Sequence, residues 1–167
     1  MTKCLTLIRH AKSSWDDASL SDYERGLNER GRRDAPRMGE ALQQRGIKFD
    51  LLLCSSAKRA RETLNLLREQ LEIEDDSIRY LDDLYCASTS TLIELIRQVD
   101  NDKNNIAIIA HNPGLEDLAA MLSNCNETFI TCSVMQIEFE INDWQQVGNV
   151  TGKQTLFLNP KIIEAAK

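Results

Sequence analysis

The chain has little glycine and proline, with seven glycines and three prolines among its 167 residues. This composition excludes collagen-like and low-complexity architectures and long proline-rich linkers. No apolar run approaches the roughly 20 residues that span a bilayer, and the apolar run before Arg9 is too short for the core of a secretion signal. A chain of this length is typical of one domain with a full core. We therefore expect a single domain over residues 1–167 and no membrane partner.

Several functional signatures are missing as well. The five cysteines form no C-x-x-C pair, and their odd number and apolar surroundings are typical of reduced thiols in the cytoplasm. Only two histidines are present, His10 and His111, which nearly excludes a multi-histidine metal site, and we expect neither a metal nor another cofactor. The glycine-rich loops that cradle nucleotide phosphates are absent. No cysteine is followed by an arginine after five intervening residues (C-x5-R), so the loop of a thiolate phosphatase is also absent.

Charge is distributed unevenly along the chain. Residues 1–68 hold 14 Lys and Arg against 9 Asp and Glu, whereas residues 69–167 hold 6 against 17, for a net charge of −6. An acidic chain is a poor general binder of nucleic acids, and we expect no nucleic-acid partner. A locally basic half suits a small anionic ligand, although the same charges could simply lie on solvated faces.

Apolar runs alternate with segments of helical periodicity. The pattern predicts buried strands at Cys4–Ile8, Asp50–Cys54 and Ile106–Ala110, and a weaker strand at Ser77–Leu81. It predicts helices from Asn28 to Gly46, from Ser55 or Ser56 to Leu71, around Leu92–Val99, and from Asn112 as cap through Leu122. From Ser133 apolar and polar residues alternate, which predicts a half-buried strand near an edge, with Gln154–Leu158 as its partner. This order of strands and helices predicts a three-layer α/β/α fold with a mostly parallel central sheet and an antiparallel edge strand.

Both histidines follow directly after predicted buried strands. Open α/β sheets bind ligands at the carboxyl ends of their strands, and His10 and His111 fall at two such ends. A histidine that only packs in the core could lie anywhere, so this placement favours a functional role for the pair. Residues 10–27 show no periodicity, and a loop of that length in a compact domain is usually functional.

Two arginines point to an anion at the same edge. Arg9 ends an apolar strand, where a buried guanidinium is costly unless it is paired. Arg59 falls in the first turn of a predicted helix, where a cation opposes the helix dipole unless a bound anion reverses the interaction; the alternative is that it points into water. Arginine recognises phosphoryl groups through planar, bidentate contacts, and neutral histidine can attack phosphorus.

Four segments, in chain order, resemble motifs of the histidine phosphatase superfamily, which has the phosphoglycerate-mutase-like fold. They read LIRHAKSSW from Leu7, RGLNERG from Arg25, SSAKRARET from Ser55 and AHNP from Ala110. The first resembles the R-H-G signature, the second opens the first long helix, and the third is similar to S-x-x-x-R-A-x-[EQ]-T. The last resembles the second-histidine motif. The resemblance covers about residues 4–122, and the short region between residues 70 and 92 looks like SixA-type phosphohistidine phosphatases.

The resemblance implies a phosphatase without a cofactor. His10 would form a transient phosphohistidine, and Arg9, Arg59 and His111 would hold the phosphoryl oxygens and stabilise charge in the transition state. Four further residues are candidates for substrate contacts: Ser13, Asp16, Arg25 and Asn112. Ser13 and Asp16 could equally be polar residues of a surface loop, and Arg25 could pair with a loop carboxylate.

The chain departs from the family pattern at two places. Ala11 stands at the signature glycine, and because alanine cannot take a positive φ without cost, we expect an ordinary turn there. Larger members carry an acidic proton donor before the third strand, for which this chain offers only Asp82 or Asp83; both are also typical of solvated loop carboxylates. A phosphoramidate leaving group needs a donor less than an alkyl phosphate ester does, which favours phosphohistidine.

We therefore expect a cytoplasmic hydrolase that acts on a phosphorylated, phosphohistidine-containing protein. One alternative is a small-molecule phosphomonoesterase of the same superfamily that uses the same His10 chemistry. The other is a non-catalytic module that binds a phosphorylated ligand. Both histidines are present although arginines alone would suffice for binding, which disfavours the module.

Overall fold

Six strands form one sheet in the order β3-β2-β4-β1-β5-β6 in the computed structural model, which describes residues 1–167. The strands are β1 (Thr2–Arg9), β2 (Leu51–Ser55), β3 (Ile78–Leu81), β4 (Asn105–Ala110), β5 (Val134–Glu140) and β6 (Lys153–Leu158). Strands β3, β2, β4 and β1 are parallel, whereas β5 is antiparallel to both β1 and β6. This mixed sheet confirms the predicted α/β fold. The antiparallel strand β5 lies second from the edge, because β6 covers its outer side.

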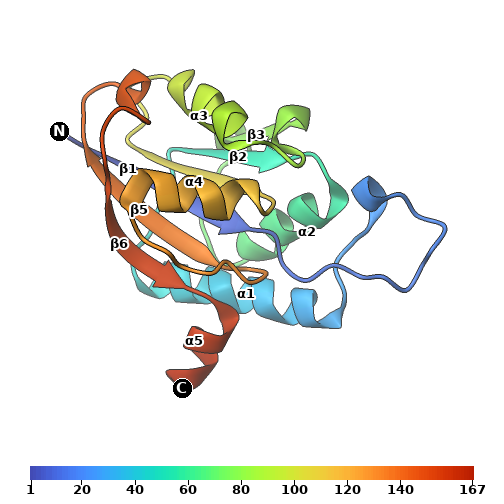
Figure 1. Cartoon of the computed structure of the whole chain (residues 1–167). Helices are drawn as coiled ribbons and strands as arrows, with labels where there is room; N and C mark the ends of the chain where they lie inside the picture. The colour runs from blue at the N-terminus through green and yellow to red at the C-terminus, as the bar shows by residue number, and fades with distance from the viewer.

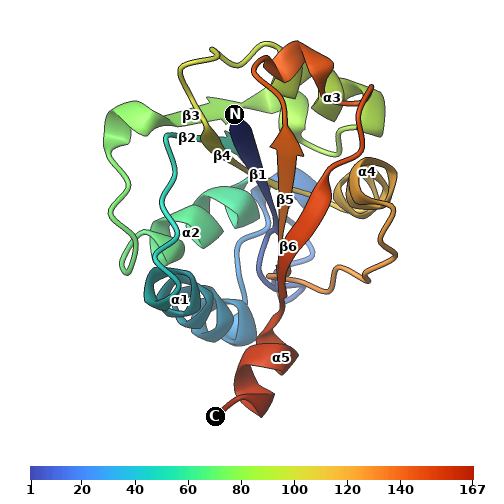
Figure 2. The ribbon, with the colours of Figure 1, turned by 90° about the vertical axis from the view of Figure 1, so that its left-hand side faces the viewer.

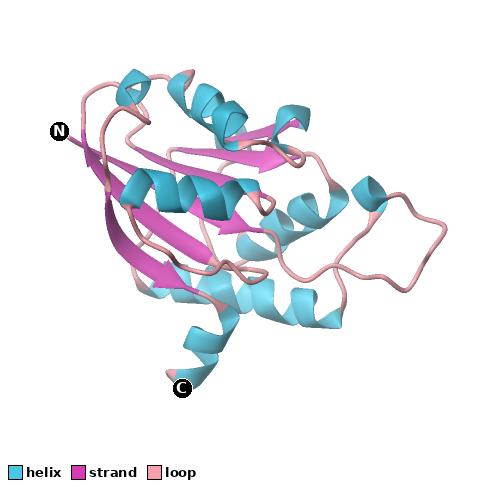
Figure 3. Ribbon diagram, viewed as in Figure 1, coloured by secondary structure: helices cyan, strands magenta, loops and turns pink.

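Helices cover both faces of the sheet (Figures 1, 2 and 3). They are α1 (Glu29–Gln44), α2 (Lys58–Leu67), α3 (Thr89–Arg97), α4 (Gly114–Ser123) and α5 (Pro160–Ala165). Helices α1 and α2 pack on one face and α3 and α4 on the other, as Figure 2 shows. The sequence analysis missed the short helix α5, although Asn159 caps it through the N–H of Ile162. None of the helices is long and apolar enough to cross a membrane.

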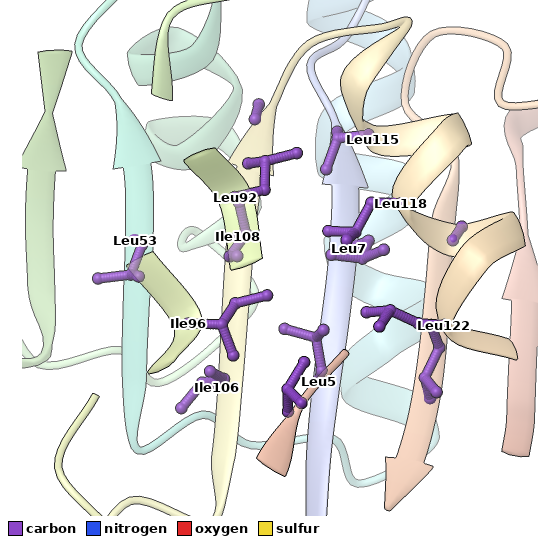
Figure 4. Packing of buried hydrophobic residues seen from close by; sticks show 14 of the residues in the cluster. Leu5, Leu7, Leu53, Leu92, Ile96, Ile106, Ile108, Leu115, Leu118 and Leu122 are labelled. Atoms are coloured by element: carbon purple, nitrogen blue, oxygen red, sulfur yellow. The ribbon is translucent and has the colours of Figure 1, made fainter. Parts of the chain in front are cut away.

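Each face of the sheet has its own buried cluster. The cluster under α3 and α4 includes Leu5, Leu7, Leu53, Leu92, Ile96, Ile106, Ile108, Leu115, Leu118 and Leu122 (Figure 4). The cluster under α1 and α2 includes Ile8, Met38, Leu42, Leu52, Cys54, Leu64 and Ile109. Strands buried on both faces are largely apolar along their length, which explains why β1, β2 and β4 appear as continuous apolar runs. Packing on both faces holds the carboxyl ends of these strands in fixed positions.

The start of α1 lies against the segment that follows β1. Asn28, where the sequence predicts the helix to start, is its cap, because its side-chain oxygen accepts a hydrogen bond of 2.9 Å from the N–H of Gly31. A Cβ on Gly31 would lie 2.3 Å from the carbonyl oxygen of Lys12. Glycine is therefore required at this position for the helix to approach the loop behind His10.

Two helices begin later than the sequence predicts. Helix α2 begins at Lys58, and neither Ser55 nor Ser56 is its cap, because the ladder of β2 with β3 continues through Ser55. Helix α4 begins at Gly114, with Pro113 rather than Asn112 in the cap position. Ser55 hydrogen-bonds to the distant His111, and Asn112 donates to the carbonyl of Phe129 while its side-chain oxygen still accepts from the N–H of Glu116 in the first turn of α4.

Lys3 lies at the start of β1 and is fully buried. Its ammonium group donates hydrogen bonds to the carbonyl oxygens of Asn101 (2.9 Å) and Lys103 (3.3 Å) and to the side-chain oxygen of Asn104 (3.1 Å). It also lies 5.3 Å from the ring centroid of Trp144, whose indole N–H donates to the carbonyl of Lys103. These contacts fasten the end of the sheet opposite to the carboxyl ends of β1 and β4.

Candidate active site

The carboxyl ends of β1 and β4 lie side by side and bring the two histidines together. The parallel register pairs Arg9 with Ala110, and His10 and His111 are the next residues along each chain segment. The centroids of their rings are 5.1 Å apart, and the side chains are buried, with 6% and 3% of the residue surface exposed. The segment between β1 and α1 extends beyond this edge of the sheet (Figure 1).

Both backbone polar groups of His10 form hydrogen bonds to neighbouring segments. Its N–H donates to the carbonyl of Ala110 (3.2 Å), and its own carbonyl accepts from the N–H of Cys132 (3.0 Å). The ring Nδ1 lies 2.7 Å from the carbonyl oxygen of Ala11. Because a carbonyl can only accept, Nδ1 carries the proton and Nε2 has the free lone pair. Burial lowers the pKa of His10 to about 3, so that the ring is neutral near pH 7.

Arg59 is buried in the first turn of α2, with 5% of its surface exposed, and does not point into water. Its Nε–H donates to Nε2 of His10 (3.2 Å), Nη1 donates to the backbone carbonyl of Asp22 (2.7 Å), and Nη2 donates to the Asp22 carboxylate (3.1 Å). The guanidinium group therefore faces the lone pair of His10. A phosphoryl group transferred to that nitrogen would lie beside this charge.

Thr63 links Arg59 to the turn that follows His10. Its hydroxyl oxygen accepts a hydrogen bond of 2.9 Å from the N–H of Ala11 and donates one of 2.7 Å to the carbonyl of Arg59. Ala11 is not among the residues with a positive φ, which confirms the ordinary turn expected at this position.

His111 hydrogen-bonds through one ring nitrogen only. Its Nε2 lies 2.8 Å from the hydroxyl of Ser55, and its Nδ1 is buried without a hydrogen-bond partner. Because the oxygen of Ser55 accepts from the N–H of Ala57 (3.3 Å), its own proton can go to Nε2, which leaves Nδ1–H as a donor for a ligand. Burial, with a smaller effect from Arg59, lowers the pKa of His111 to about 4.

Arg9 and Asn112 share one backbone acceptor. Arg9 Nη1 and Asn112 Nδ2 donate to the carbonyl of Phe129, at 2.8 and 3.0 Å, and the Asn112 side-chain oxygen accepts from the N–H of Glu116. The side chain of Asn112 thus holds the segment before β5, and its contact with substrate stays a prediction. The Nε of Arg9 is buried without a partner. Burial lowers the pKa of Arg9; the carboxylate of Glu116 partly offsets this, and the positive charge of Arg59 adds to it.

Arg25 is sandwiched between the exposed ring of Trp15 and the loop. Its guanidinium carbon lies 3.6 Å from the ring centroid of Trp15. Nη1 donates to the hydroxyl of Ser13 (2.7 Å) and the carbonyl of Ser14 (3.1 Å), and Nη2 forms an ion pair with Asp22 (2.8 Å). Arg25 and Ser13 therefore connect to the cluster through Asp22, a loop carboxylate.

The remaining acidic candidates lie apart from the histidines. Asp16 lines an open groove of about 510 Å³ together with residues at the starts of α1 and α2. The carboxylate of Asp82 accepts from the hydroxyl of Ser56. Neither Asp82 nor Asp83 hydrogen-bonds to His10 or His111, and the carboxylate that meets the cluster is that of Asp22.

The sequence analysis missed Asp22 and Tyr85. The carboxylate of Asp22 pairs with Arg25 and Arg59 and accepts from the phenol of Tyr85. The ring of Tyr85 packs edge-on against His111, with 5.4 Å between centroids. Asp22 is one of several acidic residues in the stretch 10–27, and its position three residues before Arg25 is the only signal that could have identified it.

The buried histidines give the fold an expected acid sensitivity. The folded pKa values of about 3 and about 4 lie below the ordinary 6.5, so below pH 6.5 the unfolded chain binds protons that the folded chain does not. The free energy of unfolding should therefore decrease as the pH falls from 6.5 toward the folded pKa values of the two histidines. We expect the free energy of unfolding to decrease by roughly 2 kcal/mol per histidine between pH 7.5 and 5.

Urea denaturation at the two pH values measures this loss. His111→Gln removes one of the two titrating groups, so this variant should lose about half as much stability on acidification. An equal loss in the variant and the unaltered protein would contradict the assignment of a depressed pKa to His111.

Comparison with known proteins finds a matching family model and a related sequence. The family model of the histidine phosphatase superfamily (branch 1) matches residues 5–86. An uncharacterised chloroplastic protein of Arabidopsis thaliana is 30% identical over 160 residues, which cover 91% of this chain and 73% of the relative.

Solved structures match over nearly the whole length. The putative phosphohistidine phosphatase SixA of Agrobacterium tumefaciens superposes with a TM-score of 0.79 at 27% identity, covering 95% of this chain and 98% of that one. A protein histidine phosphatase SixA in complex with tungstate matches with a TM-score of 0.80 at 20% identity, covering 95% and 97%. The second likeness concerns the fold alone.

Proposed function

The chain belongs to the histidine phosphatase superfamily, and we propose that this enzyme removes the phosphoryl group from phosphohistidine in a protein, through a covalent intermediate on His10. The observation that carries the proposal is the lone pair on Nε2 of His10. This nitrogen belongs to a buried, neutral ring and lies 3.2 Å from Nε of Arg59. The likeness to the putative phosphohistidine phosphatase SixA of Agrobacterium tumefaciens supports phosphohistidine as the substrate.

In the first step, Nε2 of His10 attacks phosphorus. The bond from phosphorus to the leaving nitrogen breaks, and its electron pair stays on that nitrogen. The guanidinium of Arg59 and the Nδ1–H of His111 stabilise the negative charge on the oxygens of the transferred phosphoryl group. The guanidinium of Arg9 contributes a further positive charge. The phosphorylated His10 is an imidazolium ring whose Nδ1–H remains bonded to the carbonyl of Ala11.

In the second step, water attacks the phosphoryl group on His10. The electron pair of the phosphorus–nitrogen bond returns to Nε2, and the proton of the water goes to phosphate and solvent. The ring is then neutral again with its proton on Nδ1, so that one cycle restores the starting tautomer. The rigid backbone of His10, bonded to Ala110 and Cys132, keeps the nucleophile aligned through both steps.

The substrate assignment rests on the leaving group. An alkyl phosphate ester needs a general acid to protonate the departing oxygen. Neither Asp82 nor Asp83 hydrogen-bonds to the histidines, and the Asp22 carboxyl, whose pKa is held well below its usual range by Tyr85 and Arg25, stays ionised. A phosphorylated imidazole that is protonated on its other nitrogen leaves as a neutral ring without such a donor. The cluster therefore favours phosphohistidine over alkyl esters.

A substrate panel tests the proposal. We expect the purified protein to release phosphate from a phosphohistidine-containing protein with a higher kcat/KM than from sugar phosphates. Faster hydrolysis of sugar phosphates would instead support a small-molecule phosphomonoesterase. Phosphate binding without turnover of any phosphoryl compound would support a non-catalytic binding module.

Inhibitors and metals give a further expected result. Vanadate or phosphate should inhibit competitively, because the guanidinium groups of Arg9 and Arg59 and the unpartnered Nδ1 of His111 can all bind an anion. Chelators should leave kcat unchanged, because Arg9 and Arg59 repel a divalent cation and protein partners already engage Nδ1 of His10 and Nε2 of His111. Activity assays with vanadate and with EDTA check both points. Loss of activity in EDTA that a divalent ion restores would contradict the expectation.

A further inference from the structure

Asp22 brings a negative charge to a site that is built for an anion. Its carboxylate lies 2.8 Å from Nη2 of Arg25 and 3.1 Å from Nη2 of Arg59, and it accepts a hydrogen bond from the phenol of Tyr85. The side chain is nonetheless 47% exposed. Asp22 therefore stands at the mouth of the cluster, where a part of the substrate other than the phosphoryl group would arrive.

Holding Arg59 in place does not account for this charge. The backbone carbonyl of Asp22 already accepts from Nη1 of Arg59, and His10 accepts from its Nε. A carboxylate adds repulsion toward any incoming phosphoryl group. Beyond its ion pairs with Arg25 and Arg59, the charge favours a substrate whose other end is positive.

We propose that the carboxylate of Asp22 recognises the leaving group, by accepting a hydrogen bond from the protonated second nitrogen of the substrate imidazole; this rests on the proposed phosphohistidine phosphatase function. The hydrogen bond stabilises the imidazolium form, in which the ring can leave as neutral imidazole. The phosphorus–nitrogen bond breaks with its electron pair on the leaving nitrogen, and the second nitrogen keeps its proton throughout. Asp22 transfers no proton.

His10 meets the same requirement within the protein. When His10 carries the phosphoryl group, the carbonyl of Ala11 accepts the hydrogen bond from its Nδ1–H. The phosphoryl group passes between two imidazole rings, and each needs an acceptor for its second N–H. Ala11 provides the acceptor for the ring of the protein, and Asp22 provides it for the ring of the substrate.

Aromatic side chains flank the proposed acceptor. Tyr85 packs edge-on against both His111 and Tyr23, with centroids 5.4 and 5.2 Å apart. The hydrogen bond to Asp22 raises the pKa of Tyr85 to about 12, so the phenol stays protonated and keeps the carboxylate in position. A planar, cationic ring fits beside such aromatic walls.

The test compares two leaving groups in one variant. Asp22→Asn keeps the size of the side chain and removes its charge. The unaltered protein and the variant are assayed with a phosphohistidine peptide, whose ring is cationic in the substrate and departs as neutral imidazole, and with p-nitrophenyl phosphate, whose leaving group carries no cationic ring and departs as an anion. Asp17→Asn is the matched control, because Asp17 lies in the same loop and its carboxylate bonds only to Ser19.

We expect Asp22→Asn to lower kcat/KM for the peptide by about ten- to hundredfold relative to p-nitrophenyl phosphate, the effect of losing one charged hydrogen bond. Asp17→Asn should leave this ratio unchanged. A parallel loss on both substrates in Asp22→Asn would mean that Asp22 serves only to hold Arg59, and would overturn the inference while the proposed function stands. If the unaltered protein fails to hydrolyse the peptide, the proposed function itself fails.

A second measurement needs no variant. Phosphoimidazole and its analogue methylated on the second nitrogen are both cationic when the first is protonated, but only the first has an N–H to donate. We expect the enzyme to accelerate hydrolysis of phosphoimidazole at least tenfold more, relative to the uncatalysed rates. Equal acceleration of the two compounds would overturn the inference even if Asp22→Asn failed to fold.

Discussion

His10→Ala is expected to reduce kcat/KM for phosphohistidine by several orders of magnitude, the scale seen when a covalent nucleophile is removed. The variant lacks the only nitrogen lone pair that faces Arg59, and neither water nor His111 can replace it, since Nε2 of His111 is engaged by Ser55. Quench-flow detection of an acid-labile phosphoenzyme, together with steady-state rates, measures the effect.

The fold should survive this substitution. His10 lies at the end of β1 and outside the two apolar clusters, and its backbone hydrogen bonds to Ala110 and Cys132 do not depend on the side chain. Thermal unfolding of the variant serves as the control. If His10→Ala kept a tenth of the wild-type activity, His10 would not be the nucleophile.

Arg59→Ala is expected to cost about 2–4 kcal/mol of transition-state stabilisation, comparable to the loss of a preorganised oxyanion donor. This corresponds to a roughly 30- to 1,000-fold lower kcat/KM. Phosphate affinity should fall in parallel, because the same guanidinium faces the bound anion. Arg59→Lys should restore activity only in part, since an ammonium group cannot reproduce the planar fork.

Arg61 offers a matched control on the same helix. It is exposed and carries the same charge two residues further along α2. Arg61→Ala should therefore leave kcat/KM unchanged, which separates a specific role of Arg59 from a general loss of positive charge. Unchanged kcat/KM in Arg59→Ala would remove Arg59 from the site and weaken the assignment of the whole cluster.

The sequence predicts the central part of the fold because parallel strands buried on both faces leave a strong local signal. Continuous apolar runs mark β1, β2 and β4, and the residues directly after them lie at one edge of the sheet because the strands are parallel. That His10 and His111 lie at the same edge follows from this rule, whereas their direct contact depends on β1 pairing with β4.

The remainder of the site depends on contacts that local patterns do not encode. Asp22 reaches Arg59 because an irregular loop folds back over α2, and Tyr85 reaches Asp22 from a connection 63 residues further along the chain. Ser55 resembles a helix cap in the sequence, but the β2–β3 ladder continues through it and its hydroxyl bonds to His111. In each case the side chain forms a hydrogen bond with a residue far away in the sequence, and no local sequence pattern predicts such a bond.

The buried ammonium of Lys3 has a consequence for how this protein can change over evolution. Lys3 lies at the start of β1 and His10 directly follows its end, about 23 Å away given the rise of about 3.3 Å per residue. Hydrogen bonds to loop carbonyls stabilise one end of the sheet, while at the other end the Nε of Arg9 is buried without a partner and the buried histidines reduce stability as the pH falls. We therefore expect substitutions near Lys3 to change thermal tolerance without affecting turnover, so that selection can act on the two properties separately.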